Sequence, residues 1–186
     1  MCTLPGWFRP TKNWDLLALD NGELVSAIEL KSINSSFGNN ANNRAEESIG
    51  SAFDAHTAFD ENLLGSSSIP PVMGYVMIVH DCPDSRIVGR GVRSAHFPID
   101  PDFEGASYLD RFLLLCDRLR RKSLYQPSGL CLRIPRMGWP MSHRRYCHTI
   151  SSSQTLLWRL ACIGRKRMKA EWISFFRLLP VPVAGP

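Results

Sequence analysis

Apolar and polar positions divide the first part of the chain into strands and a long amphipathic segment. Residues 14–19 and 24–31 are predicted strands, joined at Asn21 and Gly22, because Asn-Gly tolerates the positive φ angles of a tight hairpin turn. Residues 32–41 are polar and contain a glycine, which is typical of a loop. The pattern therefore begins with an antiparallel hairpin.

A helix is predicted over residues 43–64, with Asn43 as its N-cap and Glu46 completing a capping box. Helical spacing predicts that one stripe is buried, consisting of Ala45, Ile49, Ala52, Phe53, His56, Phe59 and Leu63. Residues 72–79 are almost wholly apolar, as in a strand buried on both faces.

Residues 81–103 contain several prolines and predict an irregular excursion, and a second helix follows over residues 106–123. Ser107 with Asp110 caps this helix, whose apolar stripe is Leu109, Phe112, Leu113, Cys116 and Leu119. The fold class is therefore α/β, an α+β mixed sheet flanked by helices.

Charge divides the chain unevenly. Residues 1–124 carry a net charge of −4, whereas residues 125–186 carry +9 and a single acid, Glu171. The second part shows no clean period, although 156–163 and 172–180 are apolar enough for short helices. We therefore predict a folded core over residues 1–125 and a poorly defined basic tail, frame-shifted or disordered, over residues 126–186.

Composition excludes several classes of protein. Hydrophobic residues make up 44% of the 186 and charged residues 21%, which suits one packed domain rather than a disordered chain. No apolar run is long enough for a membrane span, and no secretory signal opens the chain, so we expect a cytoplasmic protein without a membrane partner. The six cysteines are expected to be free thiols, and their spacing matches no zinc site.

Asp15, Glu29 and Lys31 are the candidate catalytic residues. Glu29 and Lys31 point to one face of the second strand, because side chains alternate along a strand. A two-residue turn places Trp14 opposite Glu29, whereas a three-residue loop or a bulge places Asp15 there. In that second register the two carboxylates share a face.

Two adjacent carboxylates suit Mg²⁺, which prefers oxygen ligands and keeps open positions for water and phosphate. The candidate ligands are Asp15, Glu29 and the backbone carbonyl of Leu30, and Lys31 is placed to orient or deprotonate a water molecule. This is a phosphodiesterase site in outline. The alternative is ordinary, because Glu-x-Lys on an exposed strand is a common and usually solvated tripeptide.

The polar stretch after the second strand contains candidate DNA-binding residues: Asn39, Asn40, Asn43 and Arg44. Asn and Arg read the edges of adenine and guanine. The alternative is an Asn-rich loop that caps a helix. Arg9 and Lys12 are candidate phosphate contacts, and the alternative is that both are solvated at the entrance of the strand. Glu47 is a candidate metal contact, and the alternative is a solvated acid in the first turn of the helix.

The spacing from Asp15 to Glu29-Leu30-Lys31 resembles the PD-(D/E)xK nuclease motif. Three longer blocks, at residues 5–17, 29–32 and 36–47, resemble the XhoI family of type II restriction endonucleases, and the likeness continues at 96–98 and 105–108. The resemblance extends over about residues 2–125. It implies a restriction-endonuclease-like PD-(D/E)xK core.

The resemblance further implies a Mg²⁺-dependent homodimer that cuts double-stranded DNA at CTCGAG and is paired with a protective DNA methyltransferase. By motif position, Asp15 and Glu29 are metal ligands and Lys31 is the catalytic lysine. The chain departs from the family before residue 5 and after residue 125, which predicts a truncated or frame-shifted member. The alternatives are a repair-type nuclease of the same core, an inactive remnant, or a DNA-binding module without catalysis.

Overall fold

A mixed sheet forms the centre of the computed structural model, which describes residues 2–65, 68–89, 93–126, 128–133 and 147–149. In the described part, five strands lie in the order β3 (Leu16–Asp20), β4 (Glu23–Ile33), β5 (Val72–His80), β6 (Ser128–Arg133) and β7 (Cys147–Thr149). The middle pairs β4–β5 and β5–β6 are parallel, and the outer pairs are antiparallel. The predicted α/β class is confirmed.

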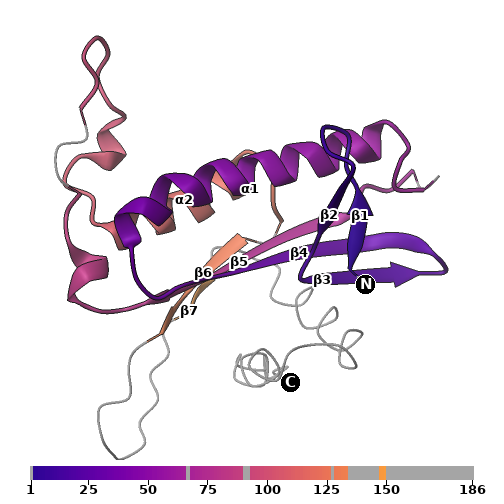
Figure 1. Ribbon diagram of the computed structural model, residues 1–186, viewed down its shortest axis with the longest axis horizontal. Helices are drawn as coiled ribbons and strands as arrows, with labels where there is room; N and C mark the ends of the chain where they lie inside the picture. Colours follow the sequence, from indigo (N-terminus) through magenta and orange to yellow (C-terminus); the bar gives the residue numbers. More distant parts are fainter. Residues whose placement is uncertain (1, 66–67, 90–92, 127, 134–146, 150–186) are drawn as a thin grey trace, which may run out of the picture.

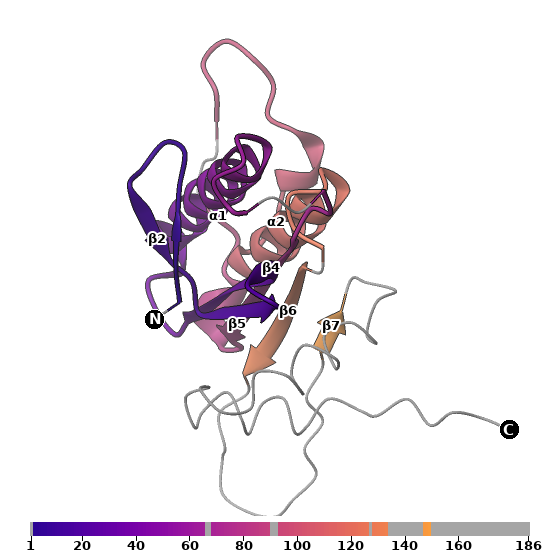
Figure 2. The same cartoon turned by 90° about the vertical axis from the view of Figure 1, so that its right-hand side faces the viewer.

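Two helices connect the parallel strands. Helix α1 (Phe37–Asp60) leads from β4 to β5, and α2 (Tyr108–Arg121) leads from β5 to β6. Both connections continue across the sheet in one direction, and crossovers of one hand then place both helices on the same face. Figures 1 and 2 show α1 and α2 side by side over that face.

The first hairpin combines a two-residue turn with a bulge. Asp20 pairs with Glu23 across Asn21 and Gly22, whose φ angles are 49° and 88°. The register then shifts, because Leu19 pairs with Leu24 but Ala18 pairs with Ser26, which leaves Val25 as the extra residue. Beyond the bulge, Ala18 pairs with Ser26 and Leu16 pairs with Ile28. Extending this register by one residue sets Asp15 opposite Glu29, as the predicted register with a bulge requires.

Helix α1 begins earlier than the sequence pattern predicts. It starts at Phe37 after Ser36, which has a φ of 54° and no side-chain capping bond, so the predicted cap at Asn43 is wrong. Strand β4 also runs on to Ile33, so the predicted loop over residues 32–41 shrinks to 34–36. At this start the Asn40 amide donates to the carbonyls of Ser35 and Ser36.

The buried face of α1 also differs from the predicted stripe. Ile49, Phe53 and Leu63 are exposed, and Phe53 stacks on Phe8 with ring centroids 5.7 Å apart. The buried residues of α1 are mostly small: Phe37, Ala41, Ser48, Ser51, Ala52, Asp54, Ala55 and Ala58. Small side chains let the helix lie close to the sheet, and the serines among them obscured the period.

The other predicted elements agree with the structure. Strand β5 is buried along most of its length, as its continuous apolar sequence predicts. Helix α2 begins with the predicted capping box, in which the Ser107 N–H donates to Asp110 at 2.9 Å and the Asp110 N–H donates back at 3.2 Å. Its stripe of Leu109, Phe112, Cys116 and Leu119 is buried in the core.

The excursion over residues 81–107 extends away from the sheet (Figure 1) and contains two short 3-10 helices, η1 (Pro83–Arg86) and η2 (Pro101–Phe103). Arg118 of α2 holds its return segment by ion pairs with Asp100 and Asp102, both at 2.9 Å. The excursion is thus anchored on α2 by Arg118.

Strand β6 lies beyond the predicted core boundary at residue 125 and extends the sheet past it. The short helices expected at 156–163 and 172–180 lie outside the described residues. In the described part of the chain, the helices are too short or too polar to cross a membrane. Cys2, Cys82 and Cys116 are free thiols, as expected.

Candidate active site

Asp15 precedes β3 and stands opposite Glu29 when the β3–β4 pairing is extended by one residue. The Asp15 N–H donates to the Ile28 carbonyl at 3.2 Å, and the Asp15 carboxylate accepts from the Leu30 N–H at 2.8 Å. The carboxylate therefore lies at the edge of β4, beside the residue that follows Glu29. The bulge at Val25 is what brings it there, since a regular two-residue hairpin places Trp14 at this position.

Glu29 is a buried carboxylate between two lysines. Only 5% of the residue is exposed, and it lies on the face of β4 that is turned toward α1. Lys31, two residues along the same strand, forms an ion pair with its Oε1. Lys12 reaches its Oε2 at 2.9 Å, although the pair is not aligned as a hydrogen bond. A buried charge requires such partners.

The donor set suits a divalent cation that prefers oxygen. The N–H and C=O of one strand residue point to the same side, so the Leu30 carbonyl points to the edge where Asp15 binds the Leu30 N–H. Two carboxylates and a carbonyl then lie at the end of β3, and Glu29 Oε2 accepts no hydrogen bond from the described residues. Those residues include no group of three or more His, Cys, Asp or Glu side chains able to hold a metal.

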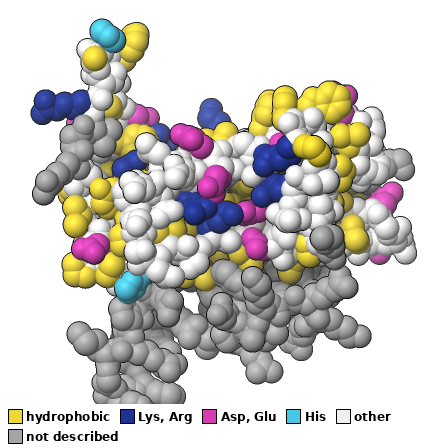
Figure 3. Space-filling view, viewed as in Figure 1, with side chains coloured by type: hydrophobic (Ala, Val, Ile, Leu, Met, Phe, Trp, Pro, Cys, Tyr) yellow, Lys and Arg dark blue, Asp and Glu magenta, His cyan; other side chains and the backbone are white. Residues whose placement is uncertain are grey.

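A pocket of about 270 Å³ opens over Glu29 and Lys31. Its lining comes from β4, α1 and the segment before β3: Arg9, Lys12, Glu29, Lys31, Glu46, Glu47, Gly50 and Ser51. On this side of the molecule, Lys and Arg side chains lie among Asp and Glu side chains near the middle (Figure 3). The mixed charge suits a site that binds both a cation and a phosphate.

The N-terminal hairpin is the part of the site that sequence reasoning missed. Strands β1 (Thr3–Pro5) and β2 (Thr11–Asn13) pair with each other and place Lys12 in the pocket. Their connecting loop is fixed on α1 by Asp54, which accepts from the N–H groups of Trp7 and Phe8 at 2.8 and 2.7 Å. Arg9 adds an ion pair with the same carboxylate at 2.7 Å.

All four candidate DNA-binding residues lie in the first turns of α1, whereas Asn39 and Asn40 were predicted in the loop before the helix. Asn39 and Asn43 are exposed and one turn apart. Asn40 is engaged in the helix start, and its side-chain oxygen accepts from Arg44 at 3.2 Å. Arg44 also pairs with Glu47. Asn39 and Asn43 are thus the two of the four with free access to solvent.

Buried polar atoms lie next to Glu29. Tyr75 of β5 is the register partner of Glu29, and its buried hydroxyl has no hydrogen-bond partner among the described residues. The same holds for the Nε of Arg44. Burial raises the pKa of the Tyr75 phenol well above its usual range, because it disfavours the charged phenolate. Tyr75 tilts against Tyr125, with ring centroids 5.2 Å apart.

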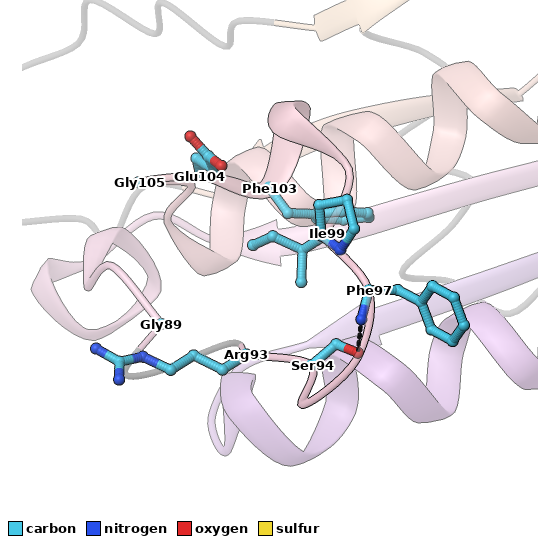
Figure 4. Close-up of a pocket in the computed structure, with 9 residues that line it drawn as sticks. Gly89, Arg93, Ser94, Phe97, Ile99, Phe103, Glu104 and Gly105 are labelled. Atoms are coloured by element: carbon cyan, nitrogen blue, oxygen red, sulfur yellow. Dashed lines mark hydrogen bonds between the residues drawn. The ribbon is translucent and has the colours of Figure 1, made fainter.

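A larger pocket, of about 470 Å³, lies on the excursion between β5 and α2 (Figure 4). Arg93, Phe97 and Phe103 are among its lining residues, and Ser94 accepts from the Phe97 N–H at 3.3 Å. It contains none of the candidate catalytic residues. The chemistry therefore points to the smaller pocket.

Comparison with known proteins gives a consistent result. The chain is 47% identical over 161 residues to the type II restriction enzyme XhoI of Xanthomonas vasicola, covering 74% of this chain and 63% of that protein. It is 44% identical over 135 residues to BstVI of Geobacillus stearothermophilus, covering 69% and 59%. For AbrI of Azospirillum brasilense the values are 50% over 98 residues, 52% and 43%.

The chain spans less than two thirds of the length of each of these relatives. No solved structure matches it. The family model described as restriction endonuclease XhoI matches residues 1–136, a range that contains the candidate catalytic residues and the whole N-terminal hairpin. The chain therefore belongs to the XhoI family of restriction endonucleases.

Proposed function

We propose that this chain carries the cleavage site of a type II restriction endonuclease that hydrolyses phosphodiester bonds of double-stranded DNA at CTCGAG. The proposal is supported by the Glu29–Lys31 ion pair and by the Asp15 carboxylate, which binds the N–H of Leu30 between them, in a member of the XhoI family. Residues 1–125 supply this core.

In the proposed site, the carboxylates of Asp15 and Glu29 and the carbonyl of Leu30 hold Mg²⁺. When bound, the ion polarises the phosphate and lowers the pKa of a coordinated water. Lys31 turns from Glu29 toward the phosphate, where its ammonium offsets the charge that develops during attack. Asn39, Asn43 and Arg44 are proposed DNA contacts, and Asn40 supports them by holding the helix start.

The palindromic target fits a two-fold assembly, because a symmetric dimer presents one site to each strand. We therefore propose that the functional unit is a homodimer. A cognate DNA methyltransferase is proposed as the partner activity, since unprotected CTCGAG sites in the host genome are substrates as well.

The test is digestion of a plasmid that carries one CTCGAG site, with Mg²⁺ and with EDTA. One discrete cut with Mg²⁺, none with EDTA, and none on a plasmid whose site differs by one base pair are the expected results. Ragged degradation instead indicates a nuclease without this specificity. An intact plasmid at high protein concentration contradicts the proposed cleavage and leaves a binding module or an inactive remnant.

A further inference from the structure

Glu29 has one more cationic partner than the sequence motif provides. Lys31 belongs to the motif and pairs with Oε1, whereas Lys12 lies on β2 and pairs with Oε2 at 2.9 Å. The residue is 5% exposed, so solvent contributes little to stabilising its charge. Each oxygen of this carboxylate therefore depends on its own lysine.

Lys12 is the more restrained of the two lysines. Its side chain is 14% exposed, compared with 26% for Lys31. Its ammonium also lies 4.8 Å from the centre of the buried Trp14 ring, at the distance of a cation–π contact. The strand that carries it is fixed to α1 through Asp54. Lys12 is therefore restrained by Glu29, by Trp14 and, through the hairpin that carries it, by Asp54.

The two lysines have different freedom to leave Glu29. Lys31 is part of β4 and faces the pocket, so rotation of its side chain brings the ammonium to a phosphate there. Once Lys31 leaves, Oε1 is open to the proposed metal, and of the two lysines only Lys12 still pairs with the carboxylate. Lys12 remains on the other oxygen and limits a change in the rotamer of Glu29.

We propose that Lys12 is a positioning residue that holds the Glu29 carboxylate in its cleavage geometry while Lys31 contacts the phosphate. The inference rests on the proposed function and adds to it a residue outside the nuclease motif. Lys12 acts through Glu29 and has no direct part in bond breaking.

The test compares Lys12→Met, Lys12→Arg and the matched control Lys122→Met, an exposed lysine at the end of α2. Under single-turnover conditions, Lys12→Met is expected to cut CTCGAG DNA roughly 10- to 100-fold more slowly, the effect of a small misplacement in an active site. Binding of the same DNA in Ca²⁺ is expected to change less than threefold. Lys12→Arg restores part of the rate, and Lys122→Met cuts at the wild-type rate.

A second measurement needs no cleavage. In metal-free urea unfolding, Lys12→Met is expected to lower the folding equilibrium constant at least about threefold more in the wild type than in Glu29→Gln, because contacting residues couple. The role of Lys12 is overturned if Lys12→Met cuts as fast as the wild type. It is also overturned if Lys12→Met changes the folding equilibrium constant equally in the wild type and in Glu29→Gln, or if DNA binding falls as much as the cleavage rate. A wild type that does not cut overturns the proposed function itself, whatever the coupling.

Discussion

Lys31→Met is expected to reduce cleavage of CTCGAG DNA by roughly 10²–10³-fold, the usual result of removing one group that stabilises transition-state charge. The side chain lies in the pocket over Glu29 and is 26% exposed, so it has room to turn toward a phosphate. Methionine keeps most of the side-chain length and removes the ammonium. The measurement is a single-turnover rate with saturating protein and Mg²⁺.

Binding separates this chemical role from a structural one. Lys31→Met is expected to retain specific DNA binding in Ca²⁺, because Lys12 still pairs with Glu29. Lys122→Met serves again as the matched control. A Lys31→Met protein that cuts at the wild-type rate contradicts the assignment of this residue.

The position of the candidate site was predictable because its motif is local. The turn at Asn21 and Gly22 and the alternation along β4 were sufficient to place Glu29 and Lys31 on one face. The register of Asp15 remained open between two alternatives. The bulge at Val25 decides it, and a bulge is a choice of backbone geometry that a short apolar–polar pattern does not specify.

Helix α1 was harder to predict, for a physical reason. Its buried positions after Phe37 are Ala and Ser residues and one acid, Asp54, so a hydrophobic period does not mark that face. The large apolar residues Ile49 and Phe53 lie on the outer side instead. Phe53 stacks on Phe8, which is distant in the sequence. Close packing against a sheet selects small residues, and a pattern based on hydrophobicity misreads them.

The pairing of Lys12 with Glu29 and the anchoring role of Asp54 were missed because their partners are far along the chain. Asp54 binds a loop more than 40 residues away, and Lys12 reaches Glu29 from a separate two-stranded sheet. Only the basic character of Arg9 and Lys12 before the first strand gave a signal, and it indicated phosphate contact. Long-range contacts of this kind require the fold before they can be inferred.

Asp54→Ala is expected to lower the free energy of unfolding by about 2–4 kcal/mol, since it leaves two N–H groups and a guanidinium without their acceptor. The carboxylate is buried and receives Trp7 N–H, Phe8 N–H and Arg9 Nε at 2.7–2.8 Å. Arg9 is partly exposed and regains solvent, so the backbone groups account for most of the loss. Urea unfolding with a matched wild type measures the difference.

The same change is expected to slow cleavage in the folded protein, because the loop that Asp54 fixes leads into the strand that carries Lys12. Gly6→Ala tests the loop from its other side: a Cβ there lies 2.5 Å from Asp54 Oδ2 and 2.8 Å from the Arg9 carbonyl, so the loop must shift. Asp60→Ala, an exposed acid at the end of α1, is the control and is expected to change stability by less than about 0.5 kcal/mol. If Asp54→Ala unfolds like Asp60→Ala, the carboxylate does not anchor the hairpin, and the placement of Lys12 over Glu29 must have another cause.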